Sequence, residues 1–200
     1  ITQTFSADQS LRSLVDVVPY GLPDEELPPH RAVIKGVWQG IEPDDKLILW
    51  GGGLWPWLDP LTAIRAMPSV LSEHPSARLV FPGTRHPNPD VMTGKTQTEE
   101  AKTLANDLRL TDSAVFFGDW IPYDRWPDVL QESDAALSLH YETFETHLAF
   151  RSRILEYIWA GVPIVATAGD VISDWITRWE IGEIVEVGDH HGLAKAICSI

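Results

Sequence analysis

The sequence has little of what marks secreted, membrane-spanning or disulfide-stabilised proteins. Cys198 is its only cysteine, so no disulfide can form within the chain and a reducing cytoplasm is the expected compartment. No apolar run approaches the roughly 20 residues that a membrane-spanning helix needs. Residues 1–10 lack the basic and apolar regions of a secretory signal, and no Met opens the chain. We therefore expect a piece of a longer cytoplasmic protein, in which any peripheral membrane contact lies outside this segment.

Positive charge is also scarce. Lys and Arg number 15 against 29 Asp and Glu, which gives a net charge of −14 at pH 7. This excess of negative charge argues against broad binding to nucleic acid or to anionic lipid. An acidic protein still binds a small anion where a few Arg side chains or backbone N–H groups converge. A small-molecule partner is therefore expected.

Motifs of several reaction classes are missing. A Walker A loop needs a glycine five residues before Gly94, where Pro89 stands. Neither the hydrolase elbow G-x-S-x-G nor an acidic D-x-D motif occurs in the chain. His140, Glu142, Glu145 and His147 lie close in sequence, but their loose loop spacing favours contact with solvent or substrate over metal binding. No metal site is expected.

What the chain does contain is an alternation of short apolar runs and amphipathic segments. The predicted strands are Leu14–Val18, Leu47–Trp50, Arg78–Phe81, Ala114–Phe117, Ala135–Leu139, Pro163–Ala166 and Glu183–Val187. The predicted helices are Pro60–Leu71, Thr98–Leu108, Tyr123–Glu132, Phe150–Ala160, Val171–Arg178 and His191–Ile200. This order predicts one α/β domain, a Rossmann-like doubly wound parallel sheet with helices on both faces. Ligands of such sheets bind at the carboxyl ends of the strands.

One strand-to-helix loop contains three consecutive glycines. Gly51, Gly52 and Gly53 follow the predicted strand at 47–50, and their N–H groups are suited to cradling a phosphate. The alternative is a simple tight turn. Pro56 excludes a dinucleotide fingerprint, because the last glycine of G-x-G-x-x-G belongs there. Trp55 follows the turn, where an aromatic ring can stack on a ligand or fill the core.

A second candidate region is the start of the predicted helix at 150–160. It places Arg151 and Ser152 in the first turn, where unpaired N–H groups and the helix dipole favour an anion. Arg151 and Arg153 add bidentate donors. Glu156, one turn further on, is placed to accept hydrogen bonds from a ribose diol. The alternative is an exposed ion pair between Arg153 and Glu156, worth about 0.2–0.5 kcal/mol.

These segments resemble a known family. The stretch LEYIWAGVPIVAT at residues 155–167 is similar to "LEAMACGTPVVAT" of the retaining GT-B glycosyltransferases of group 1. Four further motifs of that family have counterparts here in the same order, at residues 17–21, 47–53, 114–118 and 183–189. The resemblance covers roughly residues 14–200.

The resemblance implies that residues 1–200 form the nucleotide-sugar-binding, carboxy-terminal domain of a longer two-domain enzyme. That enzyme would transfer a glycosyl group, with retention of configuration, to an acceptor held by an N-terminal domain outside this sequence. No cofactor beyond the nucleotide-diphosphate sugar is implied, and the isolated domain is expected to be nearly inactive. Polysaccharide or glycolipid assembly is a typical role of the family.

The resemblance also implies site residues. The loop from Gly118 through Trp120 to Ile121 would hold the nucleotide base, and Glu156 would hold the ribose. The diphosphate would lie at residues 149–153, which include Phe150, Arg151 and Arg153. The glycine turn, Gly51 to Gly53, would face the phosphates and the sugar.

Two departures from the family pattern bear on catalysis. Leu148 stands where the family has the Glu that contacts the donor sugar, so Glu145 or Glu142 is a candidate replacement. The family's Arg and Lys after the glycine turn are missing as well, and Arg151 or Arg153 would neutralise the phosphates instead. A GT-B-like sugar-nucleotide epimerase, a phosphorylase and a non-catalytic α/β module remain as alternatives.

Overall fold

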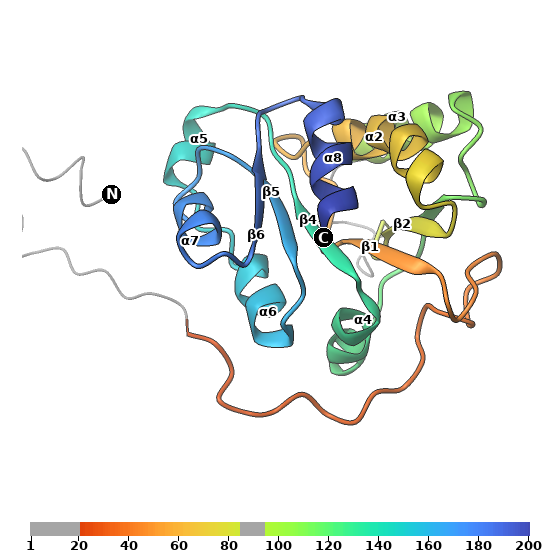
Figure 1. Ribbon diagram of the computed structural model, residues 1–200, viewed down its shortest axis with the longest axis horizontal. Helices are drawn as coiled ribbons and strands as arrows, with labels where there is room; N and C mark the ends of the chain where they lie inside the picture. The colour runs from red at the N-terminus through yellow and green to blue at the C-terminus, as the bar shows by residue number, and fades with distance from the viewer. Residues whose placement is uncertain (1–20, 85–94) are drawn as a thin grey trace, which may run out of the picture.

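The computed structural model describes residues 21–84 and 95–200, and a single parallel sheet runs through its centre (Figure 1). The strands are β1 Lys46–Trp50, β2 Ala77–Phe81, β3 Val115–Phe117, β4 Ala135–Ser138, β5 Ile164–Thr167 and β6 Gly182–Val185. They pair in the order β3-β2-β1-β4-β5-β6. The predicted doubly wound α/β fold is confirmed, while the strand predicted at 14–18 lies outside the described residues.

Helices cover both faces of the sheet. They are α2 Pro60–Glu73, α3 Lys95–Asp107, α4 Trp126–Glu132, α5 Phe144–Leu148, α6 Arg153–Ala160, α7 Ser173–Arg178 and α8 His190–Ser199, with a 3₁₀ turn, η2, at Tyr123–Arg125. No helix of the described residues is long and apolar enough to cross a membrane.

The side chains of the central strand β1 show why helices pack on both faces of the sheet. Its side chains alternate between faces, so Ile48 and Trp50 pack in the cluster formed with α2, α3 and α8. Leu47 and Leu49 pack in the opposite cluster, which α4, α6 and α7 complete. All four side chains are buried, as expected of a strand covered on both faces.

The strand order places the switch point of the fold between β1 and β4. The chain moves outward from β1 to β3 on one side, returns to β4, and then moves outward to β6 on the other side. Loops that leave β1 and β4 at their carboxyl ends therefore diverge, and a crevice opens between them. This crevice is where a ligand site is expected.

Local sequence fixes one helix end next to this crevice and another at the opposite edge of the sheet. Asp59 caps α2, since its carboxylate accepts hydrogen bonds from the N–H of Thr62 at 3.0 Å and from its hydroxyl at 2.6 Å. At the other end of the fold Gly161 terminates α6 with φ +68, as the sequence predicts. The N–H of Val162 then donates to the carbonyl of Tyr157 at 2.9 Å.

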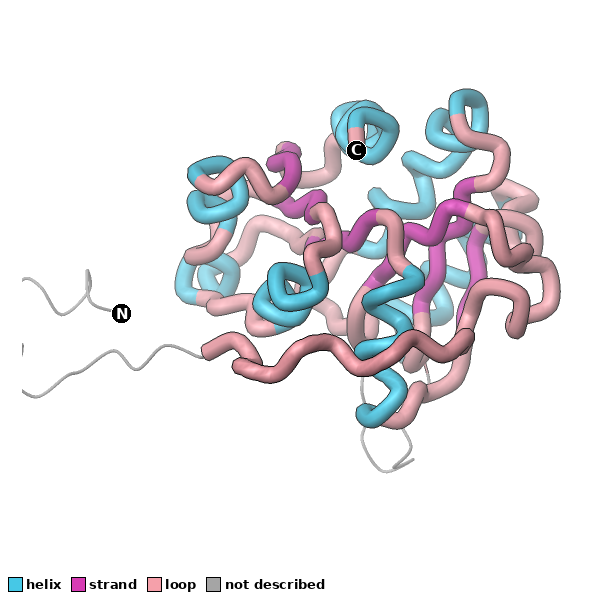
Figure 2. Tube along the Cα trace, turned by 60° about the horizontal axis from the view of Figure 1, so that its bottom comes forward, coloured by secondary structure: helices cyan, strands magenta, loops and turns pink. Residues whose placement is uncertain are grey.

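The described N-terminal stretch, residues 21–45, contains no helix or strand and runs along the face covered by α4 and α6 (Figure 2). A buried carboxylate on α4 holds it there. Glu132 accepts hydrogen bonds from the N–H groups of Val33 and Ile34 at 2.8 Å and of Lys35 at 3.1 Å. Three N–H donors compensate the burial of this charge.

Between β4 and α6 the structure differs from the prediction made from the sequence. The predicted helix at 150–160 begins only at Arg153, and the preceding polar stretch contains the short helix α5. Thr143 caps α5 by accepting from the N–H of Thr146 at 3.2 Å. Arg151 lies before α6, because its side chain is buried and turned toward Glu145 of α5 instead of extending along the helix.

Candidate functional site

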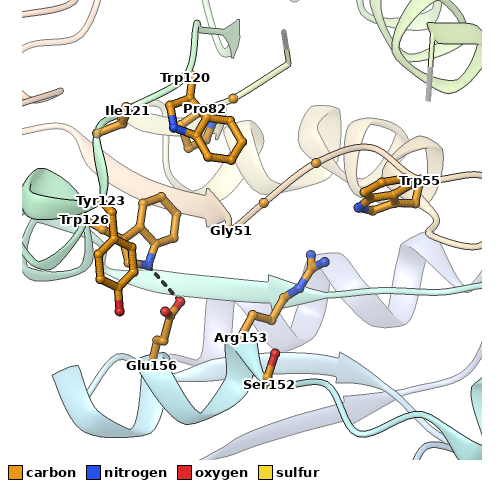
Figure 3. A pocket seen from close by; sticks show the side chains of 13 residues that line it. Gly51, Trp55, Pro82, Trp120, Ile121, Tyr123, Trp126, Ser152, Arg153 and Glu156 are labelled. Carbon is orange, nitrogen blue, oxygen red and sulfur yellow. Dashed lines mark hydrogen bonds between the residues drawn. The ribbon is translucent and has the colours of Figure 1, made fainter. Parts of the chain in front are cut away.

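A pocket of about 390 Å³ opens at the carboxyl edge of the sheet, where the turn after β1 faces the start of α6 (Figure 3). It occupies the switch-point crevice. It is lined by Gly51, Gly52, Gly53, Trp55, Pro82, Gly83, Trp120, Ile121, Tyr123, Trp126, Ser152, Arg153 and Glu156.

The glycine turn forms one wall, and two of its glycines are required by their surroundings. The N–H of Gly51 donates to the hydroxyl of Tyr157 at 3.1 Å, and a Cβ on Gly51 would collide with that hydroxyl. Gly52 has φ +116, a conformation that residues with side chains rarely adopt. Burial raises the pKa of Tyr157 to about 12, so the phenol stays protonated as a neutral support beneath the turn.

The positive charge of the pocket comes from Arg153, the first residue of α6. Its guanidinium lies beside the glycine turn, since a Cβ on Gly52 would be 3.5 Å from guanidinium atoms. Burial lowers the pKa of Arg153, but a guanidinium remains charged at any physiological pH. The dipole of α6 adds to this positive field. Two first-turn N–H groups are already paired, because Ile154 and Leu155 donate to the carbonyls of Arg151 and Ser152 at 3.0 Å. An anion is therefore favoured between α6 and the glycine turn.

The negative charge of the pocket comes from Glu156, one turn further along α6. Its Oε2 accepts a hydrogen bond from the indole Nε1 of Trp126 at 2.9 Å, which orients the carboxylate (Figure 3). Burial raises the pKa of Glu156, while the Trp126 hydrogen bond and the charge of Arg153 oppose that rise. The alternative of an Arg153–Glu156 ion pair is not among the ion pairs of the described residues, and the hydrogen bond from Trp126 orients the carboxylate instead.

Aromatic and apolar side chains form the end of the pocket next to Glu156. Trp120 and Ile121 come from the loop after β3, and Tyr123 comes from η2 (Figure 3). The loop is tied to the end of β2, because the N–H of Gly83 donates to the carbonyl of Asp119 at 3.0 Å. Trp120 and Tyr123 expose 50% and 79% of their surface, enough to contact a planar ligand.

The pocket brings together most of the predicted ligand-binding residues. Those that line it are Gly51, Gly52, Gly53, Trp120, Ile121, Arg153 and Glu156. Gly118 does not line it: its carbonyl accepts from the N–H of Thr84 at 3.0 Å, and a Cβ there would collide with the ring of Trp38. Phe150 packs edge-on against Trp175, with ring centroids 6.0 Å apart.

Arg151 and Glu145, two predicted catalytic residues, form an ion pair outside the pocket. The guanidinium Nη2 lies 2.9 Å from Glu145 Oε2. Leu148 ends α5, and Glu142 is an exposed residue before it. Among the described residues, no group of three or more His, Cys, Asp or Glu is arranged to hold a metal ion.

A buried polar cluster lies behind this ion pair. Asp170 Oδ2 is 3.9 Å from both Arg151 Nε and His140 Nε2. Burial is the main cause that lowers the pKa of His140 and raises that of Asp170. Asp170 also accepts from the N–H groups of Ile172 and Ser173 at 2.9 and 2.7 Å. The cluster joins the loops after β4 and β5 to the segment that leads into Arg153.

Several pocket residues were not predicted from the sequence. They are Trp126, Tyr123, Pro82 and Gly83, together with Tyr157 beneath the turn. Trp126 could have been suspected only weakly as a pocket residue, because a Trp in the first turn of an amphipathic helix has an N–H that needs a partner. Pro82 and Gly83 follow a strand, so the general rule for carboxyl-end loops includes them.

The fold and the pocket together define an α/β domain with a cationic pocket at its switch point. A family model covers residues 38–200 and describes the glycosyl transferases of group 1. This match spans most of the chain, which therefore belongs to the group 1 glycosyltransferases.

Individual relatives agree with this family. The D-inositol 3-phosphate glycosyltransferase of Acidothermus cellulolyticus is 29% identical over 159 residues. That alignment covers 79% of this chain but 34% of the relative, so the chain spans about a third of its length.

Solved structures share the fold. WaaG, a glycosyltransferase involved in lipopolysaccharide biosynthesis, superposes with a TM-score of 0.62 at 21% identity, covering 80% of this chain and 39% of WaaG. The C-terminal domain of the group 1 protein LpcC from Francisella tularensis gives a TM-score of 0.58 at 19% identity, covering 76% of this chain and 73% of that domain. The chain thus has the fold of a GT-B carboxy-terminal domain.

Proposed function

We propose that this chain binds the nucleotide-diphosphate-sugar donor of a glycosyltransferase, and that it acts as the donor domain of a two-domain enzyme. The observation that carries the proposal is the position of Arg153. Its guanidinium lies beside Gly52 at the start of α6, and one helical turn later Glu156 faces the same pocket. A diphosphate fits the first position, and the adjoining ribose diol fits the carboxylate of Glu156.

The chemical contribution of the domain is electrostatic. Negative charge develops on the leaving diphosphate as its bond to the sugar breaks. Arg153 and the positive end of the α6 dipole are already in place for that charge, so they lower the barrier. Arg153 takes the role that the family's missing Arg and Lys would have, whereas Arg151 is engaged by Glu145 and Asp170.

The remaining features proposed for the enzyme are those typical of its family. The transfer would retain the anomeric configuration, the acceptor would bind to an N-terminal domain, and no cofactor beyond the donor would be needed. A cytoplasmic enzyme of polysaccharide or glycolipid assembly fits these features. The isolated chain would bind nucleotide and transfer little or no sugar, because the acceptor domain lies outside it.

Calorimetric titration of the chain with UDP, GDP, ADP and dTDP tests the proposal. We expect selective binding of one diphosphate and a clear loss of affinity in Glu156→Ala. Glu183→Ala is a matched control, since it removes an exposed carboxylate on β6 far from the pocket. Equal binding by wild type and Glu156→Ala would contradict the assignment, and absence of binding of all four would favour a non-catalytic module.

A further inference from the structure

The end of the pocket remote from Glu156 is occupied by an aromatic side chain. Trp55 stands there, and Arg153 lies between it and the Trp126–Glu156 pair (Figure 3). From one end to the other, the pocket thus has three parts: an aromatic part with a carboxylate, a cationic centre at the glycine turn, and the ring of Trp55. On the proposed function, the first two hold the nucleoside and the diphosphate.

Trp55 is held as one half of a parallel stack. Its ring centroid lies 5.1 Å from that of Trp57, with 11° between the ring planes. Trp57 therefore supports one face of the Trp55 indole, while Trp55 itself lines the pocket. Both rings are partly exposed, as befits a platform next to a ligand site.

The loop that carries this stack is fixed by hydrogen bonds to the centre of the fold. The carbonyl of Trp55 accepts from the N–H of Leu58 at 3.0 Å, and the carbonyl of Trp57 accepts from the N–H of Tyr141 at 3.1 Å. The side chain of Gln97 donates to the carbonyl of Leu58 at 3.4 Å. The indole of Trp55 is thus positioned before any ligand arrives, and little ordering cost remains for binding.

The charge of the pocket narrows the chemistry of the group that meets Trp55. Arg153 and Glu156 are the charged side chains among the residues that line the pocket. Glu156 lies at the opposite end from Trp55, whereas the Arg153 guanidinium points toward the Trp55 side (Figure 3) and is engaged by the diphosphate on the proposed function. A carboxylate or phosphate on the ligand would find no second cation there. A neutral group with an apolar face is what an aromatic ring and a glycine backbone accommodate.

We propose that Trp55 is a specificity-determining residue whose indole packs against the C–H face of a neutral donor sugar. This inference rests on the proposed function, because it places the sugar beyond the diphosphate that Arg153 holds. The sugar would then lie over Trp55 next to the glycine turn, at the pocket mouth. Donors that carry a neutral hexose would bind better than those that carry a uronic acid.

The test compares each nucleoside diphosphate with its hexose conjugate by calorimetry. The pairs are UDP and UDP-glucose, GDP and GDP-mannose, ADP and ADP-glucose, and dTDP and dTDP-glucose, with UDP-glucuronate as the charged comparison. The measured quantity is the dissociation constant of the diphosphate divided by that of its hexose conjugate, which rises with the contribution of the sugar to binding. In Trp55→Ala we expect this ratio to fall about three- to tenfold, the range of one aromatic contact, while diphosphate affinity stays within about twofold.

Two variants separate stacking from a loss of structure. Trp55→Phe keeps an aromatic face and should restore most of the sugar-dependent gain. Trp179→Ala removes an exposed indole at the carboxyl end of α7, outside the pocket lining, and should leave the ratio unchanged. A ratio unaffected by Trp55→Ala, with diphosphate binding intact, overturns the role of Trp55 alone. Failure of the wild type to bind any diphosphate overturns the proposed function, and the platform with it.

Discussion

Replacement of Arg153 by Met removes the positive charge of the pocket while preserving much of the side-chain volume. If the guanidinium makes the charged hydrogen bonds to a diphosphate that its position beside Gly52 allows, it contributes about 1.5–3 kcal/mol. Arg153→Met should therefore weaken diphosphate binding about ten- to hundredfold. Arg153→Lys keeps the charge but not the planar fork, so an intermediate loss is expected.

Isothermal titration at two salt concentrations measures this effect. The wild-type affinity should decrease with added salt, because a partly exposed charge pair is screened, and the dependence should be weaker in Arg153→Met. Arg178→Met, which removes an exposed cation at the end of α7, serves as the control for net charge. A loss of less than twofold in Arg153→Met, with the fold intact, would refute the placement of the diphosphate at α6.

Three further changes test the surroundings of the pocket. Gly51→Ala should lower the unfolding free energy by about 1–3 kcal/mol because its Cβ meets the Tyr157 hydroxyl, and Tyr157→Phe in the same chain should recover part of that loss in thermal melts. Trp126→Phe removes the hydrogen bond that opposes the raised pKa of Glu156, so nucleotide binding should fail at a higher pH than in wild type when titrated from pH 8 downward. Burial lowers the pKa of His140, so the unfolded chain takes up its proton first and stability should decrease as pH falls below about 6.5; His140→Gln should flatten this decrease in denaturant titrations, and an unchanged slope would count against it.

The sheet and the glycine turn were predictable from sequence because both depend on local patterns. Continuous apolar runs such as that in β1 indicate strands buried on both faces, and three glycines after a strand indicate a tight backbone approach. The end of α6 was equally predictable, because Gly161 terminates a helix and the Pro163 that follows cannot continue it.

The start of α6 was not predictable, because it depends on a contact between separate loops. Arg151 has good helix propensity, and nothing nearby in sequence shows that it will be buried against Glu145 and Asp170. With Arg151 held in that tertiary contact, α6 begins at Arg153. The two arginines therefore differ in their contacts: Arg151 pairs with Glu145 and Asp170, and Arg153 lies beside the glycine turn. Likewise, the hydrogen bond from Trp126 to Glu156 joins residues 30 positions apart, and periodicity in sequence carries no information about it.

A crystal structure of the chain with its preferred nucleoside diphosphate tests the central claim most directly. The account predicts the β-phosphate within about 2.7–2.9 Å of the Arg153 guanidinium, the distance of a charged N–H···O bond. The ribose should lie against the Glu156 carboxylate, and the base beside Trp120 and Ile121. A diphosphate bound away from α6, or a nucleotide lying in the reverse direction with its base on Trp55, would contradict it.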